Sequence, residues 1–330
     1  MALPSSVSLI QSPTPLHRLE RLSADTGCDL WIKRDDLTGF AGGGNKGRKL
    51  EYLLADALAG GCDTVVTCGA MQSNFIRQLG AACSMFQLHC AAAVMTMPFD
   101  GQAGAAVSSL TADGGNVLLD RLLGVELFQL PDDDWLVLYA KMEELAARLE
   151  AEGRTVYRIP VGGSSPLGAY AFYLAGLEVQ RQAVGVFDWI VFASSSGSTH
   201  TGLAYAFRDT KTTVLGICSD PEPEITAEFA EMGKGLAAIL GIEPLPESAF
   251  NMRFDYVGEG YGAPYLGAYE AIRLVARREA ILLDPVYTGK AFAGLLDLTK
   301  RGEIGGRILF WHTGGTPALF AMRDPGACLG

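Results

Sequence analysis

A glycine triplet followed at once by a lysine is the first place in this chain where residue types and spacing suggest chemistry. Residues 42–52 read GGGNKGRKLEY. Apolar residues then recur at helical spacing, so we expect a helix from about Asn45 to about Gly60. Lys46 would lie at the positive end of that helix dipole, which lowers the pKa of its amine, with Lys49 one turn further on the same face. A lysine with a lowered pKa is what Schiff-base chemistry with a carbonyl compound requires.

A second segment, GAMQSNFIRQ at 69–78, follows a strand-like run and opens a helix-like one. Ligands of open α/β sheets bind at such points. Backbone N–H groups at a helix start, together with Gln72, Ser73 and Asn74, are suited to binding a carboxylate. Ser73 or Asn74 could equally be an ordinary helix cap, and the local sequence leaves both interpretations open.

The third segment, ASSSGSTHTGL at 193–203, leads from a buried strand through small hydroxyl residues into a helix. Its backbone amides and hydroxyls could form a cup for a phosphate group. It lacks the GK[ST] of a Walker A loop and the spacing of a GxGxxG fingerprint. A plain serine- and glycine-rich turn is the alternative.

Three later segments repeat this layout. Tyr261 lies between glycines in GEGYG (258–262), Tyr287 lies in DPVYTGK (284–290), and FWHTGGTP (310–317) follows the last strand-like run. Each one alone fits a turn with a packed aromatic ring. Together they place polar groups at the carboxyl ends of many strands, where the site of an open α/β sheet assembles.

Strand-like and helix-like stretches alternate along almost the whole chain, which predicts mostly parallel sheet structure covered by helices on both faces. We expect strands near 30–33, 64–67, 88–95, 125–130, 155–159, 188–192, 213–218, 254–257, 281–283 and 307–311. We expect helices near 45–60, 72–86, 104–121, 132–152 and 168–184. A length of 330 residues suggests two lobes, a smaller one over 52–158 and a larger one formed by 1–51 and 159–330.

Composition excludes several classes of protein. With 49% hydrophobic and 19% charged residues the chain is an ordered globular protein, and its net charge of −11 argues against nucleic acid or an anionic membrane as the main partner. The sequence shows neither a long apolar run nor a leader-like start, so a cytoplasmic location is expected. Seven cysteines without a CxxC pair and four unclustered histidines predict free thiols and no metal site.

Taken together, the motifs resemble one known family. The segments that match it are GGGNKGRKLEYL, GAMQSNFIRQ, GNVLLDRLLG (115–124), SSSGSTHTGL, LDPVYTGK and HTGG. They resemble the pyridoxal-phosphate-dependent family of D-cysteine desulfhydrase and 1-aminocyclopropane-1-carboxylate (ACC) deaminase, in the fold type II group similar to the tryptophan synthase β subunit. The resemblance implies two open, twisted, mostly parallel sheets, a larger lobe that binds pyridoxal 5'-phosphate, and a homodimer.

The resemblance also assigns roles to residues of this chain. Lys46 would bond covalently to the cofactor, Ser73 would bind the substrate carboxylate and relay a proton, and Tyr261 and Tyr287 would line the substrate side as catalytic residues. The residues expected to bind the cofactor are Asn45, Lys49, Asn74, Ser196, Gly197, Ser198, Thr199, Thr288 and Thr313. The residues expected to bind the substrate are Gln72, Ser73 and Asn74.

Two threonines favour one branch of that family. The ring-opening deaminases have glutamate where Thr288 stands and leucine where Thr313 stands. A carboxylate keeps the pyridine nitrogen protonated, as opening a cyclopropane demands, whereas a hydroxyl only hydrogen-bonds to it. We therefore expect α,β-elimination from D-cysteine, giving pyruvate, ammonia and hydrogen sulfide, with Lys46, Ser73 or Tyr287 removing the Cα proton.

Other substrates and functions stay open. Phe75 stands where desulfhydrases have histidine, and Ser195 and Ser198 replace glycines of the usual phosphate loop, so the amino acid decomposed need not be D-cysteine. The alternatives are an L-cysteate sulfo-lyase, an ACC deaminase and a protein that binds the cofactor without turnover. A nucleotide-binding α/β protein is the alternative outside this class.

Overall fold

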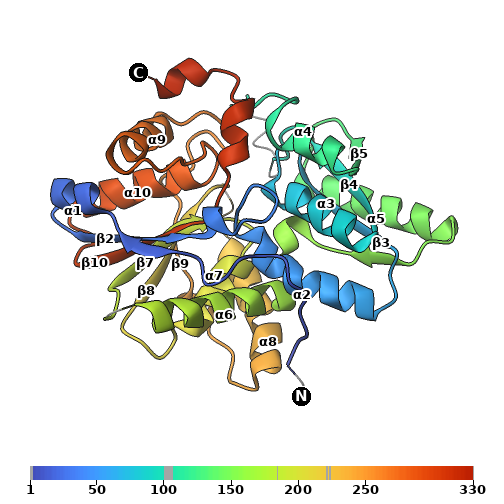
Figure 1. The fold of residues 1–330 in the computed structure, drawn as a ribbon, viewed down its shortest axis with the longest axis horizontal. Helices are drawn as coiled ribbons and strands as arrows, with labels where there is room; N and C mark the ends of the chain where they lie inside the picture. The colour runs from blue at the N-terminus through green and yellow to red at the C-terminus, as the bar shows by residue number, and fades with distance from the viewer. Residues whose placement is uncertain (1–2, 100–106, 184, 221, 223, 330) are drawn as a thin grey trace.

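Two sheets, each flanked by helices, make up the fold in the computed structural model (Figure 1). The structure describes residues 3–99, 107–183, 185–220, 222 and 224–329. The larger sheet has six strands in the order β1-β2-β10-β7-β8-β9, parallel except for β1. Its strands are β1 (Leu16–Arg18), β2 (Asp29–Arg34), β7 (Trp189–Ser194), β8 (Thr213–Cys218), β9 (Asn251–Arg253) and β10 (Arg307–His312).

The smaller sheet has four parallel strands in the order β5-β4-β3-β6. They are β3 (Thr64–Ala70), β4 (His89–Met95), β5 (Glu126–Gln129) and β6 (Val156–Arg158). The strand β3 is buried along its whole length, as expected for a strand covered on both faces.

The helices cover both faces of each sheet. They are α1 (Glu20–Thr26), α2 (Lys46–Ala59), α3 (Asn74–Phe86), α4 (Gly115–Leu122), α5 (Trp135–Ala151), α6 (Pro166–Gln182), α7 (Ser198–Ala206), α8 (Ile225–Leu240), α9 (Leu266–Glu279) and α10 (Thr288–Lys300). Alternate residues of β7 show the layering: Val191 packs into the core beneath α9 and α10, whereas Ile190 and Phe192 pack into the core beneath α6 and α7. Figure 1 shows α9 and α10 on one side of this sheet and α6 on the other.

The predicted α/β architecture with two mostly parallel sheets is confirmed. All strands of the smaller sheet fall between residues 64 and 158, inside the smaller lobe expected from the sequence. The exact lobe boundaries at 51/52 and 158/159 stay predictions. The helix α2 begins at Lys46, one residue after the expected Asn45.

Some predicted elements are wrong. No strand forms at 254–257 or 281–283, and the nearby strand β9 ends at Arg253. Ile281 and Leu283 are apolar because they are buried in the helix-covered core, not because they pair in a sheet. The helix expected at 104–121 begins only at Gly115, and residues 104–106 of that range lie outside the described residues.

The edge strand β1 and the short helix α1 were not expected from the sequence. In the part of the chain that the structure describes, no helix has both the length and the apolar character needed to cross a membrane.

Candidate active site

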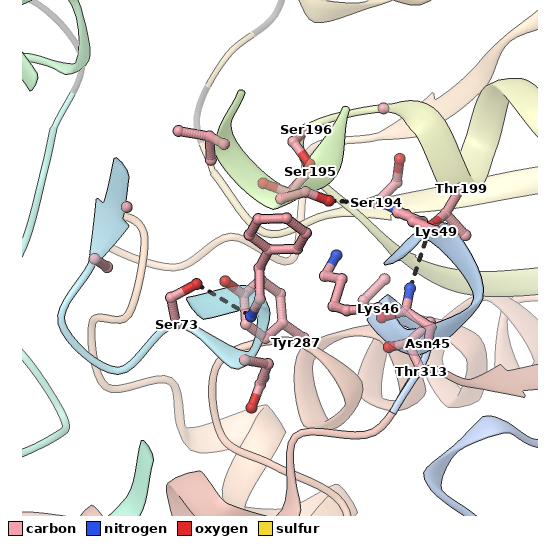
Figure 2. Close-up of a pocket in the computed structure, with 18 of the residues that line it drawn as sticks. Asn45, Lys46, Lys49, Ser73, Ser194, Ser195, Ser196, Thr199, Tyr287 and Thr313 are labelled. Carbon is pink, nitrogen blue, oxygen red and sulfur yellow. Dashed lines mark hydrogen bonds between the residues drawn. The ribbon is translucent and has the colours of Figure 1, made fainter. Parts of the chain in front are cut away.

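The carboxyl ends of both sheets meet at one cavity (Figure 2). It encloses about 760 Å³ that contains no protein atom, part of it open to solvent. Strand ends supply Gly69, Ala70, Ala193 and Ser194, and helix starts supply Asn45, Lys46, Ser73, Asn74 and Thr199. Residues from distant parts of the chain thus line one space, as expected where parallel strands end.

The glycine triplet lets the loop before α2 pack against its neighbours. Gly43 has φ +79°, and a Cβ there would lie 1.8 Å from the carbonyl oxygen of Asp36. Only glycine fits such a position. The loop then turns into α2, where the Asn45 N–H donates to the carbonyl of Thr313 at 2.9 Å. This contact brings the last turn of the larger sheet against the start of α2.

Lys46 and Lys49 both present amines to this cavity, as Figure 2 shows. Burial lowers the pKa of Lys46 to about 8, although a hydrogen bond with Lys49 opposes the shift. The pKa of Lys49 is also lowered well below its ordinary value, by burial and by the nearby charge of Lys46. Lys49 Nζ donates to the carbonyl of Gly162 at 3.1 Å, whereas Lys46 donates to no carbonyl or carboxylate of the described residues. Lys46 is therefore the amine available for reaction.

Ser73 is both a helix cap and a residue of the cavity wall. Its Oγ accepts hydrogen bonds from the N–H groups of Phe75 at 3.2 Å and Ile76 at 3.4 Å. The alternative left open by the sequence, a helix cap, is thus confirmed for Ser73. Because Oγ acts as acceptor in both bonds, its own proton is left for a group in the cavity. Ser73 and Asn74 both line the cavity.

The start of α7 forms a polar cradle opposite Lys46. Gly197, with φ +98°, precedes the helix, and a Cβ there would lie 2.3 Å from the Phe229 ring. The first N–H groups of a helix have no partner within it and favour an anion. Ser196 and Thr199 add hydroxyls, and Asn45 Nδ2 donates to Thr199 Oγ1 at 3.2 Å. This cradle suits a phosphate group.

Two tyrosines close the opposite side. The hydroxyls of Tyr261 and Tyr287 are in hydrogen-bond contact, and their ring centroids lie 5.9 Å apart. Burial raises the pKa of both phenols above the ordinary value, although the bond from Tyr287 works against the shift at Tyr261. Both hydroxyls therefore stay protonated at neutral pH and act as donors.

Three residues predicted for the site do not line the cavity: Gln72, Ser198 and Thr288. Gln72 donates to the carbonyl of Thr111 at 2.9 Å and so holds the loop before α4. Thr288 Oγ1 donates to Asp284 Oδ1 at 2.6 Å, so its hydroxyl serves the turn before α10. The functions predicted for these three stay predictions that their side-chain positions do not support.

The Ser198 hydroxyl faces the 161–164 segment, where it lies 3.3 Å from Ser164 Oγ. The remaining residues predicted for the site line the cavity: Asn45, Lys46, Lys49, Ser73, Asn74, Ser196, Gly197, Thr199, Tyr261, Tyr287 and Thr313.

The cavity also contains residues that sequence reasoning missed. Trp135 lies edge-on to Tyr261, with ring centroids 5.9 Å apart. His200, whose pKa burial lowers to about 3, contacts Ser194 Oγ at 3.2 Å through Nδ1 and is neutral. Gly162 also lines the cavity, and a second glycine, Gly163, follows it. Both glycines have positive φ, at +65° and +67°, and the glycine pair itself is the local sequence signal of a turn at this point.

The residues present fit pyridoxal phosphate. An amine with a lowered pKa and no carbonyl or carboxylate acceptor among the described residues faces a helix start able to hold a phosphate, and Lys49 adds a nearby amine. Gly162 leaves the space between them free, because a Cβ there would lie 2.4 Å from Ser196 Oγ and 3.8 Å from Lys46 Nζ. Among the described residues, no group of three or more His, Cys, Asp or Glu is arranged to hold a metal ion.

Curated relatives of this chain include proteins named D-cysteine desulfhydrase. This chain is 42% identical over 324 residues to a D-cysteine desulfhydrase of Salmonella choleraesuis (strain SC-B67). It is 40% identical over 330 residues to a D-cysteine desulfhydrase of Salmonella schwarzengrund (strain CVM19633). Each alignment covers 96% of this chain and 96% of the relative.

Solved structures and a family model are also similar to this chain. A crystal structure described as an ACC deaminase homologue superposes with a TM-score of 0.88 at 38% identity, covering 99% of this chain and 96% of the other. An O-ureido-L-serine synthase mutant, 19% identical with a TM-score of 0.66, covering 93% of this chain and 89% of the other, shows the shared fold alone. The model of the pyridoxal-phosphate dependent enzymes matches residues 7–314. The chain therefore belongs to the pyridoxal-phosphate-dependent enzymes of fold type II.

Proposed function

We propose that this enzyme converts D-cysteine and water to pyruvate, ammonia and hydrogen sulfide by β-elimination. The observation that carries the proposal is the Lys46 amine, whose pKa is lowered to about 8 and which lines the same cavity as the polar cradle at the start of α7. Relatives about 40% identical over 96% of both chains, named D-cysteine desulfhydrase, support this choice of substrate.

Pyridoxal phosphate, when bound, supplies an aldehyde for the substrate amine and a ring that withdraws electrons from Cα. Lys46 Nζ would take the proton from Cα of the substrate, since a pKa of about 8 leaves part of the amine unprotonated at neutral pH. Ser73 Oγ and the N–H groups at the start of α3 bind the substrate carboxylate. The start of α7 and Lys49 bind the cofactor phosphate.

The tyrosine pair acts on the departing sulfur. The hydroxyls of Tyr261 and Tyr287 stay protonated because burial raises the pKa of each phenol. A protonated phenol is a general acid, so we assign to this pair the proton that the thiolate takes as the Cβ–S bond breaks. Tyr287 as the base that removes the Cα proton, one of the options expected from the sequence, is disfavoured by the same shift.

Ring opening of ACC is the second candidate, because one similar structure is described as an ACC deaminase homologue. The cavity wall argues against it. No Asp or Glu of the described residues lines the cavity, and Thr313 offers only a hydroxyl. Without a carboxylate, a bound pyridine ring has no partner to keep its nitrogen protonated, which suits loss of a good leaving group better than cleavage of a cyclopropane.

A substrate panel tests the proposal. The purified enzyme with pyridoxal phosphate is given D-cysteine, L-cysteine, L-cysteate, β-chloroalanine and ACC, and the keto acid and released sulfur species are identified. We expect pyruvate and sulfide, fastest from D-cysteine. Sulfite from L-cysteate at a higher rate would indicate a sulfo-lyase, and 2-oxobutyrate would indicate a deaminase. A bound cofactor with no product from any substrate would identify a binding protein without turnover.

The quaternary structure and location belong to the same proposal. We propose a homodimer in the cytoplasm, on the basis of the family resemblance. Sedimentation equilibrium measures the first directly, and a mass of one chain would contradict it.

A further inference from the structure

Behind the cavity wall, Arg77 of α3 connects two segments that line the site. The side chain is fully buried. Its Nη1 donates to Asn74 Oδ1 at 3.0 Å and to Asn116 Oδ1 at 2.5 Å, while Nη2 donates to the carbonyl of Gly43 at 2.7 Å. One guanidinium therefore holds both the start of α3 and the glycine loop before Lys46.

These contacts fix the orientation of the Asn74 amide. A guanidinium only donates hydrogen bonds, so the atom of Asn74 that it contacts must be the oxygen. Asn116 Nδ2 donates to the same oxygen at 3.0 Å. With Oδ1 occupied twice, Asn74 has only its Nδ2 donor left for the cavity that it lines. The cavity thus receives an N–H donor at this position and not an acceptor.

The contact between Arg77 Nη2 and the Gly43 carbonyl helps to fix the position of Lys46. The Gly43 carbonyl accepts from Arg77 and also from Gln78 Nε2 at 3.0 Å. The Gln78 Oε1 accepts from the Gly47 N–H at 2.6 Å. Two adjacent residues of α3 thus hold the backbone on both sides of Lys46, across the junction of the two sheets.

We propose that Arg77 is a positioning residue for the cofactor site, which it serves through Asn74 and Gly43 without touching cofactor or substrate. The proposal rests on the proposed function of the cavity. Through Asn74 it makes the cavity favour an anionic oxygen on the bound cofactor ring. Through Gly43 it holds the Lys46 amine where it can bond to the cofactor. A core arginine that only stabilises the fold would do neither.

The test must allow for the buried Asp120. Both carboxylate oxygens of Asp120 are without a hydrogen-bond partner among the described residues, and burial raises its pKa to about 8 while Arg77 lowers it. Removing Arg77 would leave this group more costly to bury. All variants of Arg77 are therefore made in a protein that carries Asp120→Asn. The double variant with Arg77→Met is compared with the single variant Asp120→Asn, which keeps the arginine.

The measurements are the dissociation constant of pyridoxal phosphate and the pH at which the absorbance of the bound cofactor changes. We expect Arg77→Met to weaken binding about 10-fold and to raise that pH by about one unit, since Asn74 Nδ2 is no longer held in place as a donor to the anionic form. Arg77→Lys keeps the positive charge but not the planar set of N–H donors. This variant should therefore show smaller changes in affinity and in the pH transition than Arg77→Met. Arg121→Met, an exposed arginine of α4, is the matched control and changes neither.

Coupling to Asn74 separates positioning from stability. In an Asn74→Ala background, Arg77→Met should add no further pH shift. Unchanged affinity and an unchanged pH transition in Arg77→Met, with only a loss of stability, would overturn the proposal. If that variant does not fold, Asn116→Ala decides: a smaller upward pH shift, absent in the Asn74→Ala background, supports the proposal, and no shift overturns it. A wild-type protein that binds no cofactor would instead refute the proposed function.

Discussion

Two buried lysines of this enzyme have the same lowered pKa and different surroundings. Burial lowers the pKa of both Lys46 and Lys290 to about 8. Lys290 Nζ donates to the carbonyls of Val257 at 2.7 Å and Gly260 at 2.9 Å, whereas Lys46 has only its neighbour Lys49. The difference teaches that burial makes an amine less basic, whereas the lack of a carbonyl acceptor among the described residues leaves Lys46 available for chemistry.

Lys290 acts on the site from a distance. It lies in α10, whose first residues follow Tyr287, and its two carbonyl partners lie in the loop between β9 and α9 that contains Tyr261. Its ammonium group therefore ties together the two segments that carry the tyrosine pair. We interpret Lys290 as structural and Lys46 as reactive.

Replacing Lys46 should give the largest effect. Lys46→Ala removes the amine that moves the Cα proton, so we expect kcat to fall by at least about 10³-fold. The free energy of unfolding of the apoprotein should not fall, because no carbonyl loses a partner. Pyruvate release and urea unfolding measure the two. A loss of less than tenfold in kcat would contradict the assignment.

Replacing Lys290 should give the opposite pattern. Lys290→Met leaves the Val257 and Gly260 carbonyls without their donor, and the free energy of unfolding should fall by about 2 kcal/mol. The loop that carries Tyr261 is then less well held, so kcat/KM should fall about 10-fold. Covalent attachment of the cofactor should persist. Loss of attachment in this variant would remove the distinction between the two lysines.

The pH dependence of apoprotein stability should show both lysines at once. Between about pH 8 and pH 10 the unfolded chain keeps the proton of each lysine and the folded chain has lost it, so stability rises with pH. Lys46→Ala and Lys290→Met should each reduce this slope, by up to about 1.4 kcal/mol per pH unit. Urea unfolding at several pH values measures it. Equal slopes in wild type and both variants would show that burial does not shift these pKa values.

The smallest effect should come from Thr288. Its hydroxyl donates a hydrogen bond to Asp284. Thr288→Val should therefore change kcat/KM by no more than about twofold and leave the pH transition of the bound cofactor unchanged. Thr313→Val, at a residue that does line the cavity, is the matched comparison and should shift that transition. A shift with Thr288→Val and none with Thr313→Val would restore the role that the sequence suggested for Thr288.

Local patterns predicted the helix starts better than the contacts between them. The periodicity after Lys46 placed α2 to within one residue, because helix spacing and glycine conformation are local properties. The apolar run at 281–283 led to a wrong prediction of a strand. Residues buried beneath helices and residues buried in a sheet give the same short apolar pattern.

Contacts between distant residues left no local signal. Arg77 and Gly43 are 34 positions apart, and spacing alone does not show that they meet. The sequence around Thr288 likewise does not reveal that its hydroxyl donates to Asp284 and that the residue does not line the cavity.

The identity of the lysine that bonds to pyridoxal phosphate tests the central claim most directly. The reconstituted enzyme is reduced with borohydride, digested, and its cofactor-bearing peptide is sequenced by mass spectrometry. We predict one modified residue, Lys46, in wild type and in Lys290→Met, and no modified peptide in Lys46→Ala. A modification on Lys49, Lys290 or any other side chain of the wild-type protein would contradict the account.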